Sequence, residues 1–131
     1  MIPKFRAWHH ELGRMMALKS MWFQDDLIEE LELNDTVMND YITAYLDEIE
    51  LMQSTGLKDK NGKEIFEKDI LDYNGRKVIV KWHGSYASFI YEFVDELENR
   101  VTEWQPLYLS YYHFEIIGNI YENPELLEVT E

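Results

Sequence analysis

Short alternating runs of apolar and polar residues recur along most of the chain, a pattern typical of β-strands that bury one face. The first two runs cover residues 2–9 and 14–23. The four residues between them end in Gly13, which can adopt the positive φ that a hairpin loop often needs. We therefore expect an N-terminal hairpin.

Residues 24–50 follow the alternating pattern less clearly. Residues 24–35 contain six acidic residues and scattered leucines with no clean period of two, so they fit a loop or a short helix. After Asp35 or Thr36, which could cap a helix, apolar residues recur at spacings of three and four. They are Met38, Tyr41, Ile42, Tyr45 and Ile49. This spacing favours one helical segment, although the same stretch is rich in residues that favour strands, so a strand remains an alternative.

Two Asn-Gly pairs mark chain reversals in the second half. Asn61-Gly62 and Asn74-Gly75 have the residues that tolerate a type I′ turn. A strand is expected before the second pair, over residues 65–73, and an alternating strand after it, ending near Gly84. Residues 86–93 predict a further strand.

The C-terminal part continues this pattern after an interruption. Residues 95–106 predict a polar connection with room for a short helical turn, because acidic residues break the apolar pattern and Pro106 cannot donate to a ladder. Residues 108–121 are rich in Tyr, Phe and Ile and predict one or two strands, which stop before Pro124.

Together these elements predict an α+β, mainly β fold. Its core is a small, strongly curved antiparallel sheet, in its most specific form an SH3-like partial barrel over residues 58–121. The length of 131 residues suits one domain. We expect the hairpin and acidic segment at about residues 1–50 and the β core at about residues 51–128.

Charge and composition narrow the function. The net charge of −14 repels phosphate backbones and anionic lipid, and the 12 Lys and Arg form no dense block, so neither nucleic acid nor membrane is an expected partner. The absence of cysteine excludes disulfides, thiolate metal sites and thiol nucleophiles. No signal peptide or membrane-spanning run is evident, and we expect a location in the cytoplasm.

Motifs of catalysis are missing from the sequence. The four histidines lie in no HExxH or HxH arrangement, and no phosphate loop, nucleophile elbow, calcium loop or dinucleotide fingerprint occurs. We expect no metal and no cofactor. An enzyme would need His and carboxylate residues dispersed in sequence, so the sequence favours a non-enzyme. Of the four tryptophans, we expect core positions, with Trp104 near Pro106 as the exception that contacts a ligand.

Three segments resemble the YopX family of phage and prophage proteins: Leu51–Leu71, Ile116–Glu128 and the opening Lys4–His9. One position departs from the family pattern, because Lys68 stands where those proteins commonly have Gly. If that Gly serves a bend at positive φ, Lys68 must be strained or the bend relaxed. Residues 24–50 match nothing in the family.

The resemblance implies a phage or prophage origin and no known catalytic residue. Turn formers in the matching segments have a structural interpretation that we favour over binding; they are Gly56, Asn61, Gly62, Asn119 and Pro124.

Three functional classes follow from these observations. The first is a non-enzymatic accessory protein that interacts with an unknown protein partner or with itself as a homo-oligomer. The second is a nucleic-acid-associated small-barrel module, and the third is an enzyme with a dispersed His/carboxylate site. Candidate interaction residues are Trp104, Lys58, Lys60 and Lys63. The lysines lie among Asp and Glu residues, so we expect local neutralisation rather than a basic groove.

Overall fold

The computed structural model describes residues 4–96 and 104–128, which divide into two compact units, Met1–Gln53 and Ser54–Glu131. Eleven β-strands and five short 3-10 helices make up the described part, which contains no α-helix. The prediction of a mainly β protein is confirmed. That the chain folds as one domain stays a prediction.

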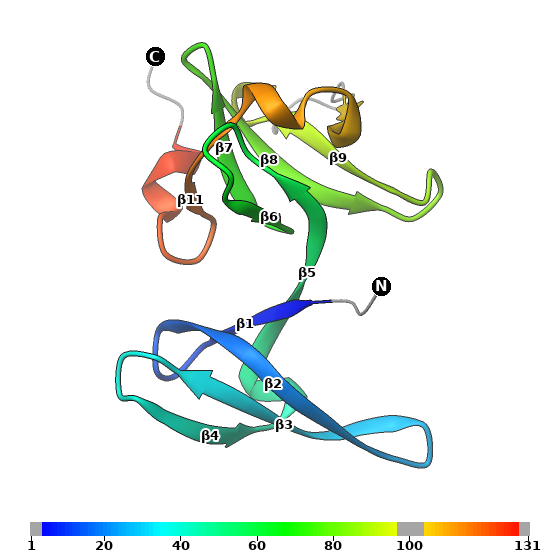
Figure 1. The fold of residues 1–131 in the computed structure, drawn as a ribbon, viewed down its shortest axis with the longest axis vertical. Helices are drawn as coiled ribbons and strands as arrows, with labels where there is room; N and C mark the ends of the chain where they lie inside the picture. Colours follow the sequence, from blue (N-terminus) through cyan, green and yellow to red (C-terminus); the bar gives the residue numbers. More distant parts are fainter. Residues whose placement is uncertain (1–3, 97–103, 129–131) are drawn as a thin grey trace. The chain divides into compact units, whose positions relative to one another are not determined.

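The first unit is an antiparallel sheet with the strand order β4-β3-β2-β1-β5 (Figure 1). The predicted N-terminal hairpin is confirmed, because β1 pairs with β2 and Gly13 has a φ of 61° in the loop between them. The strands are β1 (Phe5–His9), β2 (Arg14–Gln24), β3 (Leu27–Asp35), β4 (Asp40–Ala44) and β5 (Ile49–Lys58).

Alternation along these strands builds the core of the first unit. On β3 the side chains of Leu31, Leu33 and Asp35 are buried, while the residues between them are only partly buried. Side chains two positions apart point to the same face of a sheet, so one face of β3 packs into the core. The core consists of Ala7, Met16, Leu31, Leu33, Ala44 and Ile49.

The predicted helix in residues 36–50 is wrong. This stretch forms β4 and a single-turn 3-10 helix, η1 (Leu46–Glu48). The apolar spacing of three and four was misleading, because Met38, Tyr41 and Tyr45 are exposed and form no buried face. Pairing of β4 with β3, from Leu31–Ala44 to Asp35–Asp40, satisfies the backbone of both strands and outweighs the weak local preference.

The loop or short helix expected at residues 24–35 is also wrong, since nine of these residues form β3. The alternation of buried and partly buried residues in the second half of β3 was missed because its partly buried positions include glutamates. Glu30 and Glu32 alternate there with Leu31 and Leu33.

The second unit contains the last part of β5, which pairs with β6 (Glu64–Phe66), and an antiparallel sheet in the order β10-β9-β8-β7-β11 (Figure 1). The sheet strands are β7 (Asp69–Tyr73), β8 (Arg76–His83), β9 (Ser88–Phe93), β10 (Trp104–Pro106) and β11 (Glu115–Asn119). The 3-10 helices are η2 (Val94–Glu96), η3 (Leu107–Leu109), η4 (Tyr111–His113) and η5 (Pro124–Leu127).

Aliphatic and aromatic residues share the core of this unit. Tyr91 on β9 meets Phe114 with ring centroids 4.9 Å apart, and Tyr73 meets the same Phe114 ring at 5.4 Å. Such edge-on contacts suit the charge distribution of aromatic rings. The buried cluster is Ile65, Leu71, Val78, Val80, Tyr91, Leu107 and Phe114.

The two Asn-Gly pairs reverse the chain in different ways. Asn74 and Gly75, with φ of 50° and 88°, form the tight turn between β7 and β8, as predicted for type I′. At the other pair, of the two residues only Gly62 has a positive φ, so this reversal is not type I′.

The strand predicted over residues 65–73 is broken into β6 and β7 by Lys68, whose φ is 69°. The bend that the family pattern suggested is therefore kept, with a lysine in it. The Lys68 N–H donates to the carbonyl of Val80 at 2.9 Å, and its carbonyl accepts from the N–H of Ile120 at 3.1 Å. These bonds hold the bend in place.

The remaining expectations for this half are met in part. The connection at 95–106 includes the end of η2 and β10, while residues 97–103 lie outside the described part. Residues 108–121 form one strand, β11, after two 3-10 turns. Within the described residues the edge strands β10 and β11 do not pair with each other, so the sheet is open and the SH3-like partial barrel stays a prediction.

Candidate functional site

Asp59, in the first family-like segment, organises the turn that follows β5. Its Oδ1 accepts the N–H groups of Asn61 and Lys63, both at 2.9 Å, and its Oδ2 accepts the N–H of Ile116 at 3.0 Å. Burial of Asp59 raises its pKa, but these backbone N–H groups and the Lys63 charge outweigh burial and lower the pKa below 3.8. The carboxylate therefore joins the turn to β11 and is not available to a ligand.

Asn119 plays a similar part in the second family-like segment. Its Oδ1 accepts the N–H groups of Tyr121 at 3.0 Å and Glu122 at 2.8 Å. A Cβ on the neighbouring Gly118 would lie 2.4 Å from Oδ1 of Asn123, so a larger residue there would displace the Asn123 side chain. The other turn formers are also placed structurally: Gly56 and Gly62 have positive φ, and Pro124 begins η5.

The three candidate lysines lie on and around the Asp59 turn. Lys58 ends β5 opposite Glu64, Lys60 lies 3.8 Å from Glu115, and Lys63 donates its backbone N–H to Asp59. Each lysine is thus near a carboxylate: Lys58 across the strand pair, Lys60 through its side chain and Lys63 through its backbone. This placement agrees with local neutralisation of the lysines.

Two further cations of the second unit are engaged in the same way. Arg76 forms an ion pair with Asp95 at 2.9 Å and lies over the Phe93 ring at 3.6 Å, and Lys81 pairs with Glu92 at 3.1 Å. These pairs leave less positive charge to attract a phosphate backbone.

Trp104, the remaining candidate, belongs to a group of rings that we call the aromatic patch: His83, Tyr86, Trp104 and Tyr108. The Trp104 ring centroid lies 4.7 Å from that of His83 and 5.1 Å from that of Tyr86. The rings come from the end of β8, the β8–β9 turn, β10 and η3. The sequence indicated Trp104 but missed the other three residues.

Hydrogen bonds fix the rings of the aromatic patch. Nδ1 of His83 accepts the backbone N–H of Tyr86 at 3.1 Å. A side-chain hydrogen bond with Tyr86 raises the pKa of the Tyr108 phenol above 10.0. Tyr86 and Tyr108 are nevertheless 45% and 50% exposed, so their faces are open to a partner.

The expectation that the other tryptophans fill the core is wrong. Trp22 and Trp82 are exposed, and Trp8 is only partly buried. Trp82 packs its ring against Phe89 at 5.0 Å at the surface of the second unit. Smaller aliphatic residues fill most of both cores, and Tyr91 and Phe114 supply the buried aromatic rings.

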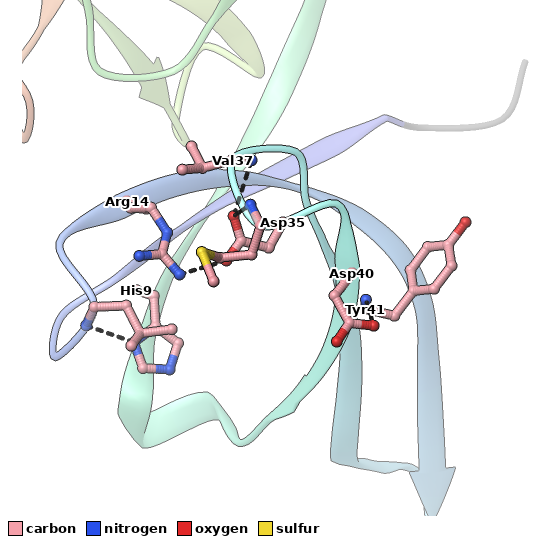
Figure 2. Close-up of polar contacts among 8 residues, drawn as sticks. His9, Arg14, Asp35, Val37, Asp40 and Tyr41 are labelled. Carbon is pink, nitrogen blue, oxygen red and sulfur yellow. Dashed lines mark hydrogen bonds and ion pairs between the residues drawn. The ribbon is translucent and has the colours of Figure 1, made fainter.

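An ion pair joins the partly buried Arg14 to the buried Asp35 in the first unit (Figure 2). Asp35 also accepts the N–H groups of Val37 at 3.1 Å and Met38 at 3.4 Å through Oδ1. Burial raises the pKa of Asp35, but the Arg14 hydrogen bond, the two N–H groups and the Arg14 charge together lower it. The pair thus anchors the β3–β4 turn.

Among the described histidines, His9 and His83 hold turns, and the exposed His10 lies 3.6 Å from Glu50. Nδ1 of His9 accepts the N–H of Leu12 at 3.1 Å, which is a turn contact like that of His83. No three His, Asp or Glu side chains of the described residues gather so as to hold a metal ion. Residues 4–96 and 104–128 also include no helix long and apolar enough to cross a membrane. The absence of a cofactor stays a prediction.

Comparison with known proteins finds both a protein family and solved structures that this chain resembles. The family model described as YopX protein matches residues 4–128. The expectation that residues 24–50 match nothing in the family is therefore wrong, because the match includes them. The chain is also similar to a solved structure, protein EF1440 from Enterococcus faecalis, with 30% sequence identity, a TM-score of 0.65, and coverage of 98% of this chain and 99% of that chain. No curated protein matches.

Proposed function

Since the chain belongs to the YopX protein family, as its sequence predicted, we propose that it is a phage- or prophage-encoded accessory protein that acts through protein contacts. It works without catalysis, in the bacterial cytoplasm. The family-like residues support this proposal, because Asp59, Gly118 and Asn119 serve turns rather than a reactive centre.

The aromatic patch is the observation that carries the proposal. Tyr and Trp are the residues that most often dominate binding energy at protein interfaces, because they bury large areas and keep a polar group for hydrogen bonding. The rings of the patch already hold one another, so a partner that covers them orders few additional side chains. Lys58, Lys60 and Lys63 remain candidate contacts outside the patch.

Nucleic acid is a weaker candidate partner. Its backbone would meet a net charge of −14, and Lys60, Arg76 and Lys81 already face carboxylates. A dispersed enzyme site is also weaker, because His9 and His83 both use a ring nitrogen to hold a backbone N–H. A protein that acts through protein contacts needs neither free cations nor free histidine nitrogens.

Affinity capture tests the proposal directly. Tagged wild-type protein and the Tyr86→Ser/Trp104→Ser variant would be expressed in infected or induced bacteria, and the recovered proteins compared. We expect a partner, or a second copy of the chain, that the wild type retains and the variant loses. Sedimentation of the purified wild type shows whether that partner is the chain itself.

Trp82→Ser provides the matched control, because Trp82 is an exposed tryptophan of the same unit outside the aromatic patch. It should retain the partner. The proposal fails if the wild type and the patch variant, both folded by circular dichroism, recover the same proteins.

A further inference from the structure

The hairpin of β2 and β3 extends beyond the rest of its sheet (Figure 1). β1 pairs with β2 only from Arg14 to Ala17, and β4 pairs with β3 only from Leu31 to Asp35. Among the described residues, 22–30 therefore form a two-stranded ribbon whose outer edges pair with no other strand, and we call them the ribbon tip. Two-stranded ribbons are marginal alone and gain stability from a covering surface.

Large apolar side chains project from the ribbon tip. Trp22, Phe23 and Leu27 are 60%, 62% and 73% exposed. Beside them an open hollow is lined by Gln24, Asp25, Leu27, Ile28 and Glu29. Clustered exposed apolar side chains on a soluble surface are a feature of interaction sites.

The charge of the ribbon tip restricts what can cover it. Asp25, Asp26, Glu29 and Glu30 give residues 22–30 four carboxylates, and no Lys or Arg occurs between Lys19 and Lys58. A second ribbon tip would bring like charges together, which costs free energy and slows encounter. A partner with positive charge around an apolar centre is complementary on both counts.

We propose that the ribbon tip docks a basic protein surface. Trp22 and Leu27 lie on one face of the ribbon and Phe23 on the other, because successive strand residues alternate and Leu27 pairs with Gln24. A cleft of the partner receives the tip, with apolar walls against both faces and with Lys or Arg side chains that face the carboxylates of the tip. This surface lies in the other unit from the aromatic patch. The inference shares with the proposed function only the premise that the protein acts through contacts.

The turn of the ribbon allows a charge to be removed without weakening the fold. Asp25 and Asp26 have φ of 52° and 65°, the left-handed conformation that Asn and Gly adopt at Asn74-Gly75. The double substitution Asp25→Asn/Asp26→Gly places the favoured type I′ pair there and removes two charges. The variant should fold at least as well as the wild type.

Three labelled 12-residue peptides of alternating composition would serve as probes: lysine–leucine, lysine–serine and glutamate–leucine. Fluorescence anisotropy would measure their binding to the full chain at low and high salt. We expect the lysine–leucine peptide to bind best. The Asp25→Asn/Asp26→Gly variant should bind this peptide about fivefold more weakly at low salt, and its affinity should depend less on salt. Trp22→Ser/Phe23→Ser should weaken it by more than about tenfold, as loss of aromatic anchors does.

Two controls separate the tip from the charge of the whole molecule and from the aromatic patch. Glu125→Gln/Glu128→Gln removes two exposed charges from the second unit and should leave binding unchanged. Tyr86→Ser/Trp104→Ser should also leave it unchanged, so a failure of the proposed function would not affect this result. Equal loss in the Glu125/Glu128 variant, or no binding of the lysine–leucine peptide, would overturn the inference.

Photo-cross-linking identifies the natural contact. A photoreactive residue at Leu27, and at Leu109 as a control on the second unit, would be activated in infected bacteria. We expect a cross-linked peptide rich in Lys or Arg from Leu27 alone. An acidic peptide, a second copy of this chain, or the same product from both positions would contradict the inference.

Discussion

At the residue scale, Lys68 keeps a strained backbone conformation because hydrogen bonds to other segments hold it. Its φ of 69° lies in the left-handed region, and its backbone bonds to Val80 and Ile120 prevent relaxation. A side chain in this conformation costs roughly 1–2 kcal/mol, and glycine avoids that cost while losing roughly 0.5–1 kcal/mol to chain entropy.

We therefore predict that Lys68→Gly raises the free energy of unfolding by about 0.5–1 kcal/mol, the difference of those two effects. Urea unfolding measures the change. Lys68→Ala is the control, because it removes the same side chain but keeps the strain. A Gly variant less stable than the Ala variant would contradict the interpretation.

The lowered pKa of Asp35 predicts that the free energy of unfolding depends on pH. Its folded-state pKa lies below the ordinary 3.8, because the contacts with Arg14, Val37 and Met38 outweigh burial. A lowered pKa means that the unfolded chain takes up the proton first as pH falls. The stability from this carboxylate is thus complete above pH 3.8 and is lost as pH falls through the folded pKa.

The expected result is a wild type that is more stable than Asp35→Asn at neutral pH, with the difference shrinking below about pH 4. Urea midpoints from neutral to acidic pH measure it. The effect of Asp59 is present in both proteins and cancels. A difference that does not change with pH would show that the pair acts by packing alone.

At the scale of secondary-structure elements, a tight turn determines the register of the two strands that it joins. The Asn74-Gly75 turn fixes the register of β7 and β8 down to the closing pair of Tyr73 and Arg76. Gly75 has a φ of 88° and open space around a hypothetical Cβ, so its constraint is conformational and not steric contact with neighbours.

Replacing Gly75 with Val should lower the free energy of unfolding by about 1–3 kcal/mol, the cost of a β-branched residue at positive φ. Thermal or urea unfolding would measure the loss. Gly84→Ala is the matched control, since Gly84 also has open space but no positive φ. An unchanged melting temperature in Gly75→Val would remove the type I′ assignment.

At the scale of the whole molecule, charge sets the long-range behaviour. The net charge of −14 acts before any contact forms, and Lys60, Arg76 and Lys81 face carboxylates at short range. Both effects oppose an approach by phosphate.

We accordingly predict no nonspecific binding of duplex DNA. An anisotropy titration at low salt should stay flat into the micromolar range. Binding that weakens steeply as salt rises would reveal a phosphate footprint and favour the nucleic-acid class. Lys58→Glu/Lys63→Glu would then test whether the candidate lysines form it.

Chain connectivity makes a second prediction for the whole molecule. β5 pairs with β1 up to Gln53 and with β6 from Ser54, so both units share one strand. We expect one cooperative unfolding transition, in line with the predicted single domain.

A core substitution tests this prediction. Leu71→Ala, in the core of the second unit, should lower the free energy of unfolding by about 2–5 kcal/mol. Single-tryptophan variants retaining Trp8 or Trp82 should report the same shift. Separate transitions would indicate two domains.

The sequence by itself determined the features that depend on neighbouring residues: the family, the mainly β character and the reversals at Gly13, Gly62 and Gly75. A left-handed φ is a local requirement, so local residue types reveal it. Tertiary structure alone decided the rest. The apolar spacing of residues 36–50 favoured a helix, and only the pairing of β4 with β3 made this stretch a strand, because propensity differences are small beside ladder formation and burial. It also gathered the aromatic patch from separate elements and left Trp22 outside the core, since contacts between residues distant in sequence have no local pattern.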